Sequence, residues 1–335
     1  MKALVVRLDS FGDVLLAGPA VRAVAAHSTH VTLLCGPLGE PAARLLPGVD
    51  EVLVWAAPWE GFDPPSVDPA DVDALVGRLR EAAFDSALVL TSFHQSPLPT
   101  ALLLRLAGVG RIGADSVDHP GRLLDVRHRR LPGRHEAEAA LDTAAALGFP
   151  PPPGDDGRLR VVPPPDTVSL TGNGPYVVVH PGASAPARAW SPERCAQAVA
   201  LLTDAGHRVV VTGGPGESGL TRRVSGDTAV DLGGRTDPRA LAGVLRSADV
   251  LVSGNTGPAH LAAAVGTPVV SLFAPVVPAE RWAPYGVPSV LLGDQNAPCA
   301  NSRALRCPVP GHPCLEEVTP DDVVSAVGKL VKECV

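Results

Sequence analysis

The sequence is poor in aromatic residues and in lysine. Phe, Trp and Tyr make up 4% of the 335 residues, although hydrophobic residues make up 45%, and lysine occurs only at positions 2, 329 and 332. With so few large side chains, the core has to be built mainly from Ala, Val and Leu, as buried parallel strands and their covering helices usually are. The chain is long for one compact core, so we expect two domains.

An excess of positive charge and a long apolar segment are both absent. The formal net charge of −7 argues against general nucleic-acid binding, because a basic surface dominates the affinity of such proteins. The sequence has no run of about 20 apolar residues that would span a bilayer, and the stretch "MKALVVRLDS" is too short for a signal peptide. We therefore expect a soluble, cytoplasmic protein.

Closely spaced cysteine pairs are absent as well. The six cysteines include Cys35 inside an apolar run and Cys299, Cys307 and Cys314, which lie near His312. The gaps of seven and six residues between the late cysteines lack the C-x₂₋₄-C pairing of structural zinc sites. The pattern fits reduced thiols better than a disulfide framework, and we expect no bound metal.

Apolar runs bounded by turn residues alternate with helical patterns, which is the signature of a parallel sheet built from βαβ units. The first half contains predicted strands at 3–8, 30–35, 51–55, 86–91 and 111–114, and predicted helices at 13–27, 71–83, 97–107 and 134–147. The second half restarts with "PYVVVHPGAS" and contains predicted strands at 207–213, 229–232, 249–253 and 268–273, and helices at 191–205, 237–248 and 257–265.

Each half opens with an apolar strand that runs into a turn of small residues. We therefore interpret the chain as an α/β protein with two Rossmann-like domains whose parallel sheets face a cleft. The first domain is predicted at residues 1–165 and the second at 166–318, joined through a Pro-rich linker at 148–166. Residues 319–335 form a predicted C-terminal helix, N-capped by Thr319, that is able to pack back on the first domain.

The first turn, "RLDSFGDVLLAGPA" (7–20), carries Asp13 where dinucleotide-binding folds carry glycines that receive a pyrophosphate. A carboxylate there would repel phosphates. It would suit a general base that takes a proton from an acceptor hydroxyl. The alternative interpretation is a first-turn acid that stabilises its helix by roughly 0.3–1 kcal/mol. The residues alone leave both interpretations open.

The second half supplies the anion site that the first half lacks. In "SGNTGPAH" a strand ends at a tight turn, and the hydroxyl of Thr256 and the N–H groups of Gly257, Ala259 and His260 can converge on a phosphate. The alternative is an ordinary turn capped by Thr256, with His260 packed on the helix.

Two further loops follow strands of this half. "VVVHPGASAPARAWSPERC" (177–195) presents Ser184 and Arg188, and an arginine near a helix N-terminus is favoured where something anionic binds. The alternative is a surface arginine. "VVVTGGPGESGL" presents Gly213 and Gly214 for close approach of a ligand, with Glu217 placed to bond a ribose or a base.

A local excess of arginine lies between residues 101 and 135. This stretch holds seven arginines and three aspartates. It faces either an anionic partner or solvent, and the sequence does not decide between them. His94, in "TSFHQSPLPTALLL", is either a residue that orients an acceptor or a capping residue of a loop.

Three segments resemble the signature regions of the lipopolysaccharide heptosyltransferases, glycosyltransferase family 9: "VVRLDSFGDVLLAGPAVRAV", "HPGASAPARAWSPERCAQAV" and "SGNTGPAHLAAAVGTPVVSLFAPVVPAERWAPYG". The resemblance continues in order to the ending "CPVPGHPCLEEVTPDDVVSAV". It implies the GT-B fold and an inverting, metal-independent transfer of heptose from an ADP-sugar to a lipid-linked acceptor. It implies no cofactor, because the nucleotide-sugar is a substrate.

The resemblance also implies roles for individual residues. Asp13 falls on the acid of the family's G-D motif, the implied catalytic base, and Arg188 on the basic position that contacts the donor diphosphate. Ser184 falls on a hydroxyl position of the same loop. Thr256, Gly257 and His260 fall on the (Ser/Thr)-Gly-x-x-His turn that holds the phosphates.

One departure concerns the sugar. The family commonly has Asp before that turn, where this chain has Asn255, so heptose is put in doubt although donor recognition remains possible. Acceptor contacts are expected from Gly12, His94 and Arg122.

The predicted function is therefore a glycosyltransferase that moves heptose or a related sugar from an ADP-sugar to a glycan or lipid-linked acceptor, with Asp13 as base. Such an acceptor allows peripheral attachment to the inner face of the cytoplasmic membrane. Two alternatives stay open: a nucleotide-sugar epimerase of the GT-B fold and a non-catalytic nucleotide-sugar-binding protein. The sequence gives no oligomeric state.

Overall fold

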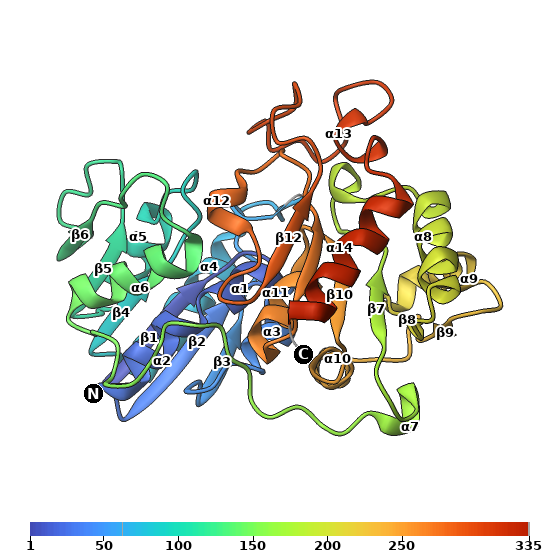
Figure 1. Cartoon of the computed structure of the whole chain (residues 1–335). Coiled ribbons are helices and arrows are strands. Elements are labelled where there is room, and N and C mark those ends of the chain that lie inside the picture. The colour runs from blue at the N-terminus through green and yellow to red at the C-terminus, as the bar shows by residue number, and fades with distance from the viewer. Residues whose placement is uncertain (62, 334–335) are drawn as a thin grey trace. The chain divides into compact units, whose positions relative to one another are not determined.

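The computed structural model describes residues 1–61 and 63–333. The chain divides into two compact units, Met1–Val162 and Pro163–Val335. We call them unit 1 and unit 2 and describe each by itself. Both consist of a parallel sheet with helices packed on it (Figure 1).

Unit 1 contains a six-stranded sheet in the order β3-β2-β1-β4-β5-β6. Its strands are β1 (Lys2–Arg7), β2 (His30–Cys35), β3 (Glu51–Val54), β4 (Ser86–Val89), β5 (Arg111–Asp115) and β6 (Val126–His128). All pairs are parallel, and Val5 of β1 lies opposite Leu33 of β2 and Leu88 of β4. This is the strand order of a doubly wound nucleotide-binding domain.

Helices cover both faces of this sheet. They are α1 (Phe11–Leu16), α2 (Gly18–Ala26), α3 (Glu40–Ala43), α4 (Pro69–Ala82), α5 (Leu98–Leu106) and α6 (Glu136–Leu147). Leu4 and Val6 of β1 share a buried cluster with residues of α4 and α5. Helices α2 and α6 pack on one another and on β1 and β5 but contribute nothing to that cluster. Because alternate strand residues face opposite sides, α2 and α6 cover the other face.

Unit 2 contains a second six-stranded parallel sheet, in the order β12-β11-β10-β7-β8-β9. Its strands are β7 (Val177–His180), β8 (Val209–Val211), β9 (Val230–Asp231), β10 (Val250–Gly254), β11 (Val269–Leu272) and β12 (Ser289–Leu292). Counted within the unit, the strands follow the same order as in unit 1. The two units therefore share one topology.

The helical segments of unit 2 are α7 (Val168–Thr171), η1 (Pro186–Arg188), α8 (Pro192–Asp204), η2 (Pro215–Glu217), α9 (Ser218–Ser225), α10 (Pro238–Arg246), α11 (Gly257–Val265), α12 (Ala279–Trp282), α13 (Pro313–Glu316) and α14 (Pro320–Glu333), where η marks a 3₁₀ turn. Helix α14 packs on α8, β10 and β12 of its own unit. The predicted packing of this helix on the first domain stays a prediction.

The predicted α/β class with two parallel sheets is confirmed, but the sequence analysis missed some elements. The helix predicted at 13–27 is two helices that meet at Ala17, because Pro19 has no N–H and its ring would clash with the carbonyl of Leu15 in a continuous helix. The edge strands β6 and β12 were not predicted. Both are short, and neither is fully buried, so their apolar signal is weak.

Much of the segment predicted as a linker is fastened to unit 1. Two nitrogens of Arg22 donate to the carboxylate of Asp155 at 2.7 and 2.8 Å, and this bond holds the pKa of Asp155 down at about 2. Further along, the N–H of Val162 donates to the carbonyl of Leu45 at 2.8 Å. The boundary between the units therefore follows directly after residue 162.

The helices of the described ranges are short relative to the thickness of a bilayer. The longest helices in the described ranges, α4 and α14, have 14 residues each, whereas a membrane span needs about 20. Within those ranges, no helix is both long enough and apolar enough to cross a membrane.

Two glycines of unit 1 should respond oppositely to replacement by alanine. A Cβ at Gly36, after β2, would lie 2.4 Å from the carbonyl oxygen of Leu8, whereas one at Gly77, within α4, would meet nothing within 4 Å. We expect Gly36→Ala to lower the free energy of unfolding by about 1–3 kcal/mol and Gly77→Ala to raise it by about 0.5–1 kcal/mol. Urea unfolding monitored by circular dichroism measures both. Equal stability of the two variants would contradict the packing described here.

Candidate active site

The shared topology places a switch point in each sheet, where successive connections leave in opposite directions. In unit 1 it lies between β1 and β4, and in unit 2 between β7 and β10. Ligands of doubly wound sheets bind at such points, outside the carboxyl ends of the strands. The predicted site residues Asp13, Arg188 and Thr256 all follow strands that border these two points.

In unit 1 the switch point is organised by Arg7, the last residue of β1. Its side chain is only 3% exposed and lies 3.2 Å from carboxylate oxygens of both Asp9 and Asp13, and 4.0 Å from one of Glu136. It also donates to the hydroxyl of Ser92, just beyond β4, at 2.8 Å. A buried guanidinium is stable only when its charge is paired, so Arg7 gathers these groups.

Asp13 is the carboxylate on Arg7 that is most open to a substrate. Its side chain is 19% exposed, compared with 8% for Asp9 and 1% for Glu136. It accepts from Arg7 at 3.2 Å and from the hydroxyl of Ser10 at 2.8 Å. Because Asp13 also lies in the first turn of α1, the geometry is compatible with both chemistry and helix stabilisation.

The charges at this point are predominantly negative. Four carboxylates surround two guanidinium groups: Asp9, Asp13, Asp115 and Glu136 around Arg7 and Arg130. Arg130 pairs with Asp115 at 3.3 Å, pairs with Glu136, and donates to the carbonyl of Thr91 at 3.0 Å. This excess of carboxylates disfavours a phosphate in unit 1.

A hydrogen-bond chain extends from the cluster to Glu60. The hydroxyl of Ser92 donates to Asp9 at 3.0 Å, the N–H of Ser92 donates to Gln95 at 2.6 Å, and the Gln95 amide donates to both oxygens of Glu60 at 2.7 and 2.6 Å. Burial and the charge of Asp9 raise the pKa of Glu60 to about 7, and burial also raises the pKa of Asp9. The cluster can therefore hold a proton near neutral pH.

In unit 2 the loop after β7 lies against the end of β10. A Cβ at Gly254 would be 2.5 Å from the carbonyl oxygen of Arg188, so only glycine fits there without movement. Ser184 of this loop is exposed and Arg188 is half-buried. At the base of the loop, His180 contacts the hydroxyl of Thr212 at 3.0 Å, and burial lowers its pKa, which keeps the ring neutral.

Glu217 lies beside the same edge of the sheet. One carboxylate oxygen accepts from the N–H of Gly214 at 2.7 Å, and a Cβ at Gly182 would be 1.9 Å from the other oxygen. A Cβ at Gly213 would be 2.6 Å from Thr221. The space beside these glycines is therefore taken by the side chains of Glu217 and Thr221. Glu217 also caps the turn after β8.

Asn255 is the residue at which the sequence departs from the family pattern. Its amide donates to the carbonyl of Ala274 at 3.3 Å, and its carbonyl accepts from the N–H of Ala274 at 3.3 Å. The residue is 5% exposed. Both polar groups are thus used to join the ends of β10 and β11, and the predicted contact with the donor has no support from this geometry.

The turn into α11 presents the predicted phosphate-binding groups. Thr256 is the N-cap residue, with extended backbone, and its side chain makes no capping hydrogen bond. The N–H of Ala259, predicted to bind a phosphate, donates to the carbonyl of Thr256 at 3.1 Å. Pro258 has no N–H, and the N–H of Gly257, at the first helical position, has no acceptor within the helix. His260 is 6% exposed. Thr256 thus occupies the cap position without a side-chain capping bond, and the burial of His260 agrees with the alternative, so phosphate binding here stays a prediction.

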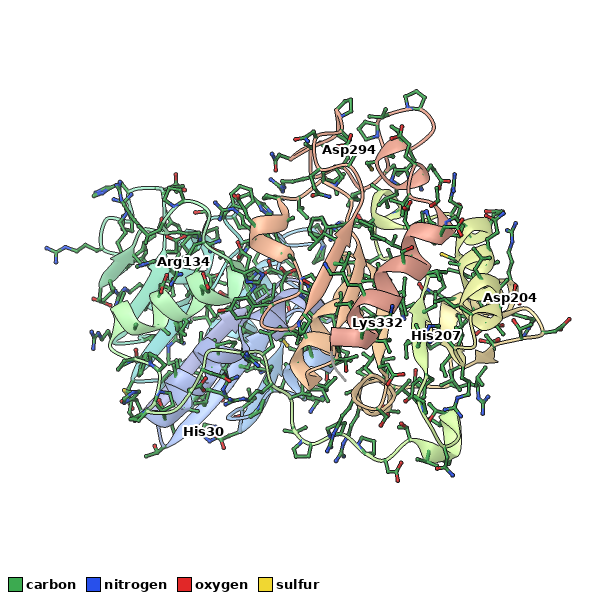
Figure 2. All side chains as sticks on the ribbon, in the orientation of Figure 1. His30, Arg134, Asp204, His207, Asp294 and Lys332 are labelled. Carbon is green, nitrogen blue, oxygen red and sulfur yellow. The ribbon has the colours of Figure 1, made fainter. Side chains whose placement is uncertain are left out.

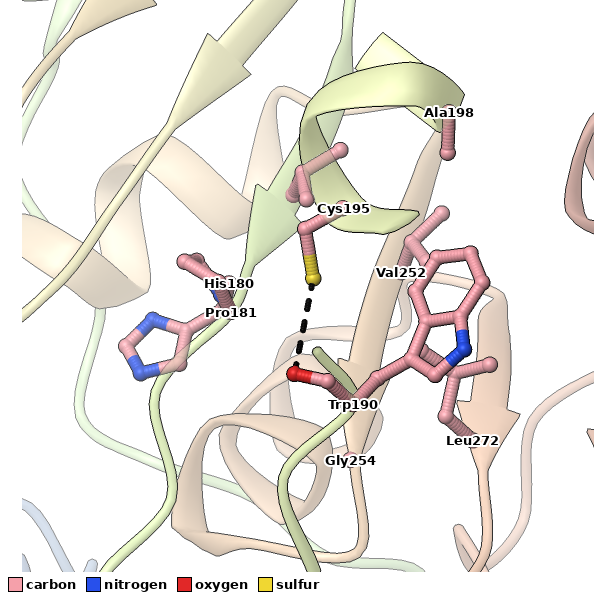
Figure 3. Close-up of a pocket in the computed structure, with 9 residues that line it drawn as sticks. His180, Pro181, Trp190, Cys195, Ala198, Val252, Gly254 and Leu272 are labelled. Carbon is pink, nitrogen blue, oxygen red and sulfur yellow. Dashed lines mark hydrogen bonds between the residues drawn. The ribbon is translucent and has the colours of Figure 1, made fainter. Parts of the chain in front are cut away.

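A small cavity of about 10 Å³ is lined by residues of β7, β10 and β11, of α8 and of the loop before α8 (Figure 3). His180, Trp190 and Cys195 contribute to its lining, and the Cys195 thiol points to the carbonyl of Trp190 at 4.0 Å. Its volume is about that needed by one water molecule. A nucleotide does not fit this cavity, so the cavity is not the predicted binding site of the nucleotide-sugar.

Most arginines of the 101–135 stretch have partners within unit 1. Arg105 pairs with Asp125 at 2.6 Å, and Arg127 donates to the carbonyl of Ser116 at 3.0 Å. Arg134, which is labelled in Figure 2, donates to the side chains of Glu138 and Asp142 on α6. The exposed ones are Arg111, Arg122 and Arg129. The spare positive charge of the stretch is thus smaller than its composition suggests.

Gly12 and His94, which are also predicted to contact the acceptor, differ in their exposure to solvent. Gly12 is buried in α1, whereas His94 is exposed in the loop between β4 and α5. The rings of His94 and Phe93 meet edge to face with centroids 5.4 Å apart.

The late cysteines lie in the core of unit 2. Cys299 and Cys314 are buried members of one apolar cluster, and Cys307 packs on it. Burial and the neighbouring Cys299 raise the pKa of Cys314 to about 12, so this thiol stays protonated. No set of three or more His, Cys, Asp or Glu side chains in the described ranges could hold a metal ion.

Comparison with known proteins assigns the family. The model of glycosyltransferase family 9 (heptosyltransferase) matches residues 72–311, more than half of the chain. The chain belongs to glycosyltransferase family 9. No curated protein sequence matches it significantly.

Solved structures show the same fold over the whole chain of this glycosyltransferase. ADP-heptose LPS heptosyltransferase II of E. coli has 20% identity and a TM-score of 0.75, with 99% of each chain covered. A family 9 glycosyltransferase of Veillonella parvula has 18% identity and a TM-score of 0.76, with 99% of this chain and 97% of that chain covered. The E. coli heptosyltransferase WaaC with ADP has 19% identity and a TM-score of 0.70, with 99% of each chain covered.

These findings confirm the predicted GT-B fold class and the predicted glycosyltransferase. Because the family is one of glycosyltransferases, the alternatives of an epimerase and of a non-catalytic binding protein are not favoured. The individual site residues stay predictions.

Sequence reasoning missed several polar residues of the glycosyltransferase's unit 1, among them Arg7, Glu60, Gln95 and Glu136. One signal was available for Arg7. It ends the apolar run "ALVVR" and is followed two residues later by an acid, and a charge at the end of a buried strand requires a partner. Glu60 and Gln95 lie in separate loops and Glu136 begins α6, so their proximity appears only in the fold.

Restoring the family's usual acid should destabilise this chain. Asn255→Asp removes the amide that donates to Ala274 and leaves a carbonyl oxygen unpaired beside a buried charge. We expect a loss of about 1–3 kcal/mol in the free energy of unfolding at pH 7, measured by urea unfolding. Asn173→Asp, at an exposed loop position, is the control. A stability equal to that of the control would show that the Ala274 contact is not needed.

The raised pKa of Glu60 predicts a pH-dependent stability. The folded protein holds the proton from pH 4.5 up to about 7, whereas the unfolded chain has lost it, so this contribution is complete below pH 4.5 and is lost as the pH rises to about 7. Glu60→Gln, which stays neutral, should therefore be more stable than wild type at pH 8 by about 1 kcal/mol, allowing for partial exposure. At pH 4 this advantage should be absent, because Glu60 is then protonated and neutral as well. Urea unfolding at both pH values measures this, and a constant difference would refute it.

Proposed function

We propose that this glycosyltransferase transfers heptose or a related sugar from an ADP-sugar to a hydroxyl of a glycan or lipid-linked acceptor, with inversion and with Asp13 as general base. The observation that carries the proposal is the position of Asp13. It is the most exposed of three carboxylates that share one buried guanidinium. It also stands where the unit 1 sheet has its switch point.

The shared guanidinium supports the role of a base. Asp13 takes the acceptor proton as the acceptor oxygen attacks the anomeric carbon, and the bond from that carbon to the diphosphate breaks, which releases ADP. A single displacement inverts the anomeric centre. When Asp13 is protonated, Arg7 still pairs with Asp9 and Glu136, so the step leaves no buried charge without a partner.

The donor side of the proposal rests on unit 2. Arg188 and Ser184 lie in the loop packed on the end of β10, and Thr256 and Gly257 open α11 from that same strand end. Main-chain N–H groups at a helix start and a guanidinium both stabilise a leaving diphosphate. Two solved relatives support the ADP assignment: WaaC with ADP-2-deoxy-2-fluoro heptose and the heptosyltransferase TibC with ADP-D-beta-D-heptose.

The acceptor side is proposed in unit 1. The exposed Arg122 and His94 would contact the acceptor near Gly12 and Asp13. Exposed arginines 111, 122 and 129 would meet an anionic headgroup, which supports peripheral attachment to a membrane. The nucleotide-sugar is a substrate in this proposal, and no cofactor or metal takes part.

Replacement of Asp13 tests the proposal without an identified acceptor. Water replaces the acceptor in slow hydrolysis of ADP-heptose, followed by release of ADP. Asp13→Asn should lower this rate by about 10²–10⁴-fold, the usual contribution of a general base, while ADP affinity changes little. Asp73→Asn, an exposed residue of α4, is the matched control. Hydrolysis at the wild-type rate in Asp13→Asn would reject the base.

A separate binding experiment tests which nucleotide the sugar donor carries and whether Arg188 binds it. ADP-, UDP- and GDP-sugars are compared by calorimetric binding to wild type and to Arg188→Ala. We expect ADP-sugars to bind most tightly and Arg188→Ala to weaken them by about tenfold to a hundredfold, as for loss of a charge-assisted bond. Equal binding of the three nucleotides would refute the choice of ADP, and full affinity in the variant would refute the role of Arg188.

A further inference from the structure

Unusual backbone conformations gather in the segment between β12 and α14. In the described ranges, four residues other than glycine have positive φ, and three of them lie here: Asn301 (60°), Arg303 (58°) and His312 (50°). Such a conformation is strained for a non-glycine residue and persists only where surrounding contacts enforce it. The contacts of this segment therefore indicate what it holds in place.

The segment holds Ala187, the residue before Arg188, from both sides. The N–H of Ala187 donates to the carbonyl of Leu305 at 2.9 Å, and its carbonyl lies 3.1 Å from Nε2 of His312. A carbonyl only accepts, so His312 donates with Nε2–H. Ala187 is fully buried. Both main-chain groups of this residue are thus fixed by the loop that leads into α13 (Figure 1).

Further contacts hold the loop before α13, and α13 itself, to other elements of unit 2. Glu316 of α13 accepts from the hydroxyl of Ser191 at 3.3 Å and from Arg194 at 3.2 Å. At the other end, the N–H groups of Asn301 and Arg303 donate to the carbonyls of Pro275 and Val276, both at 2.8 Å. The strained loop is therefore tied to the segment after β11, and α13 is tied to the start of α8.

The main chain at 187–188 is consequently confined on two sides. On one side the carbonyl of Arg188 touches Gly254 at the end of β10, where a Cβ would lie at 2.5 Å. On the other, the imidazole of His312 holds the carbonyl of Ala187. Since the carbonyl of Ala187 belongs to the peptide that includes the nitrogen of Arg188, this bond fixes the orientation from which the Arg188 side chain departs.

We infer that His312 is a positioning residue for donor binding, which acts through the Ala187 carbonyl on Arg188. The inference rests on the proposed role of Arg188 toward the ADP diphosphate. A glycine would adopt the conformation of His312 without strain, so the imidazole is unfavourable for the local backbone and its bond to Ala187 offsets that cost. Binding and stability should therefore respond differently to its removal.

Two variants separate the positioning role from a merely structural one. His312→Gly removes the imidazole and relieves the backbone, so we expect ADP to bind about tenfold more weakly, the effect of losing one bond to a buried carbonyl. The melting temperature should stay within a few degrees of wild type, because strain relief offsets the lost bond. His312→Gln restores a donor of similar reach and should recover most of the affinity. Calorimetry with ADP and thermal unfolding measure both.

The combination with Arg188→Ala distinguishes this inference from the proposed function. If His312 acts through Arg188, His312→Gly/Arg188→Ala binds ADP as Arg188→Ala alone does. Additive losses, or wild-type affinity in His312→Gly, would overturn the positioning role while Arg188→Ala still binds weakly. Full affinity in Arg188→Ala would instead reject the proposed function. His119→Ala, an exposed histidine of unit 1, is the control and should bind ADP as wild type does.

Discussion

The buried guanidinium of Arg7 is the charge on which the arrangement of unit 1 depends. It is 3% exposed, and the cost of burying it is offset only by carboxylates from separate elements. Those partners join the loop after β1, the first turn of α1 and the start of α6, and Ser92 adds the end of β4. Asp13, the most exposed of these carboxylates, is thereby held by Arg7, whose charge is also paired with Asp9 and Glu136. This is the arrangement that a carboxylate needs if it is to change its protonation state during turnover.

The two sheets share one topology, but the residues that follow their strands differ in charge. In unit 1 the carboxyl ends of β1 and β4 carry more carboxylates than guanidinium groups, whereas in unit 2 the ends of β7 and β10 carry Arg188 and the start of α11. This difference in charge does not arise from the sheets, which have the same strand order. It arises from the few residues that follow each strand. In the proposed function, the carboxylates after β1 would serve the base and the positive groups of unit 2 would serve the leaving diphosphate, so each anion would have its own partners.

The sequence predicted the parts whose signal is local. Apolar runs gave most strands, and the turns with Asp13, Arg188 and Thr256 stood out because each follows such a run. The edge strand β6 was missed because three half-buried residues carry little pattern. Glu60 and His312 were out of reach for another reason. Glu60 meets Gln95 across 35 positions and His312 meets Ala187 across 125, and no spacing rule connects residues so far apart.

Asn255 shows why a motif position does not by itself define a role. From the sequence alone, the amide of Asn255 in place of the family's usual acid was interpreted as a sign of which sugar is bound. In the fold, both of its polar groups pair with the main chain of Ala274, and the side chain is almost fully buried. A carboxylate accepts but does not donate, so it would complete only half of this pairing. The amide is therefore explained by the junction of β10 and β11.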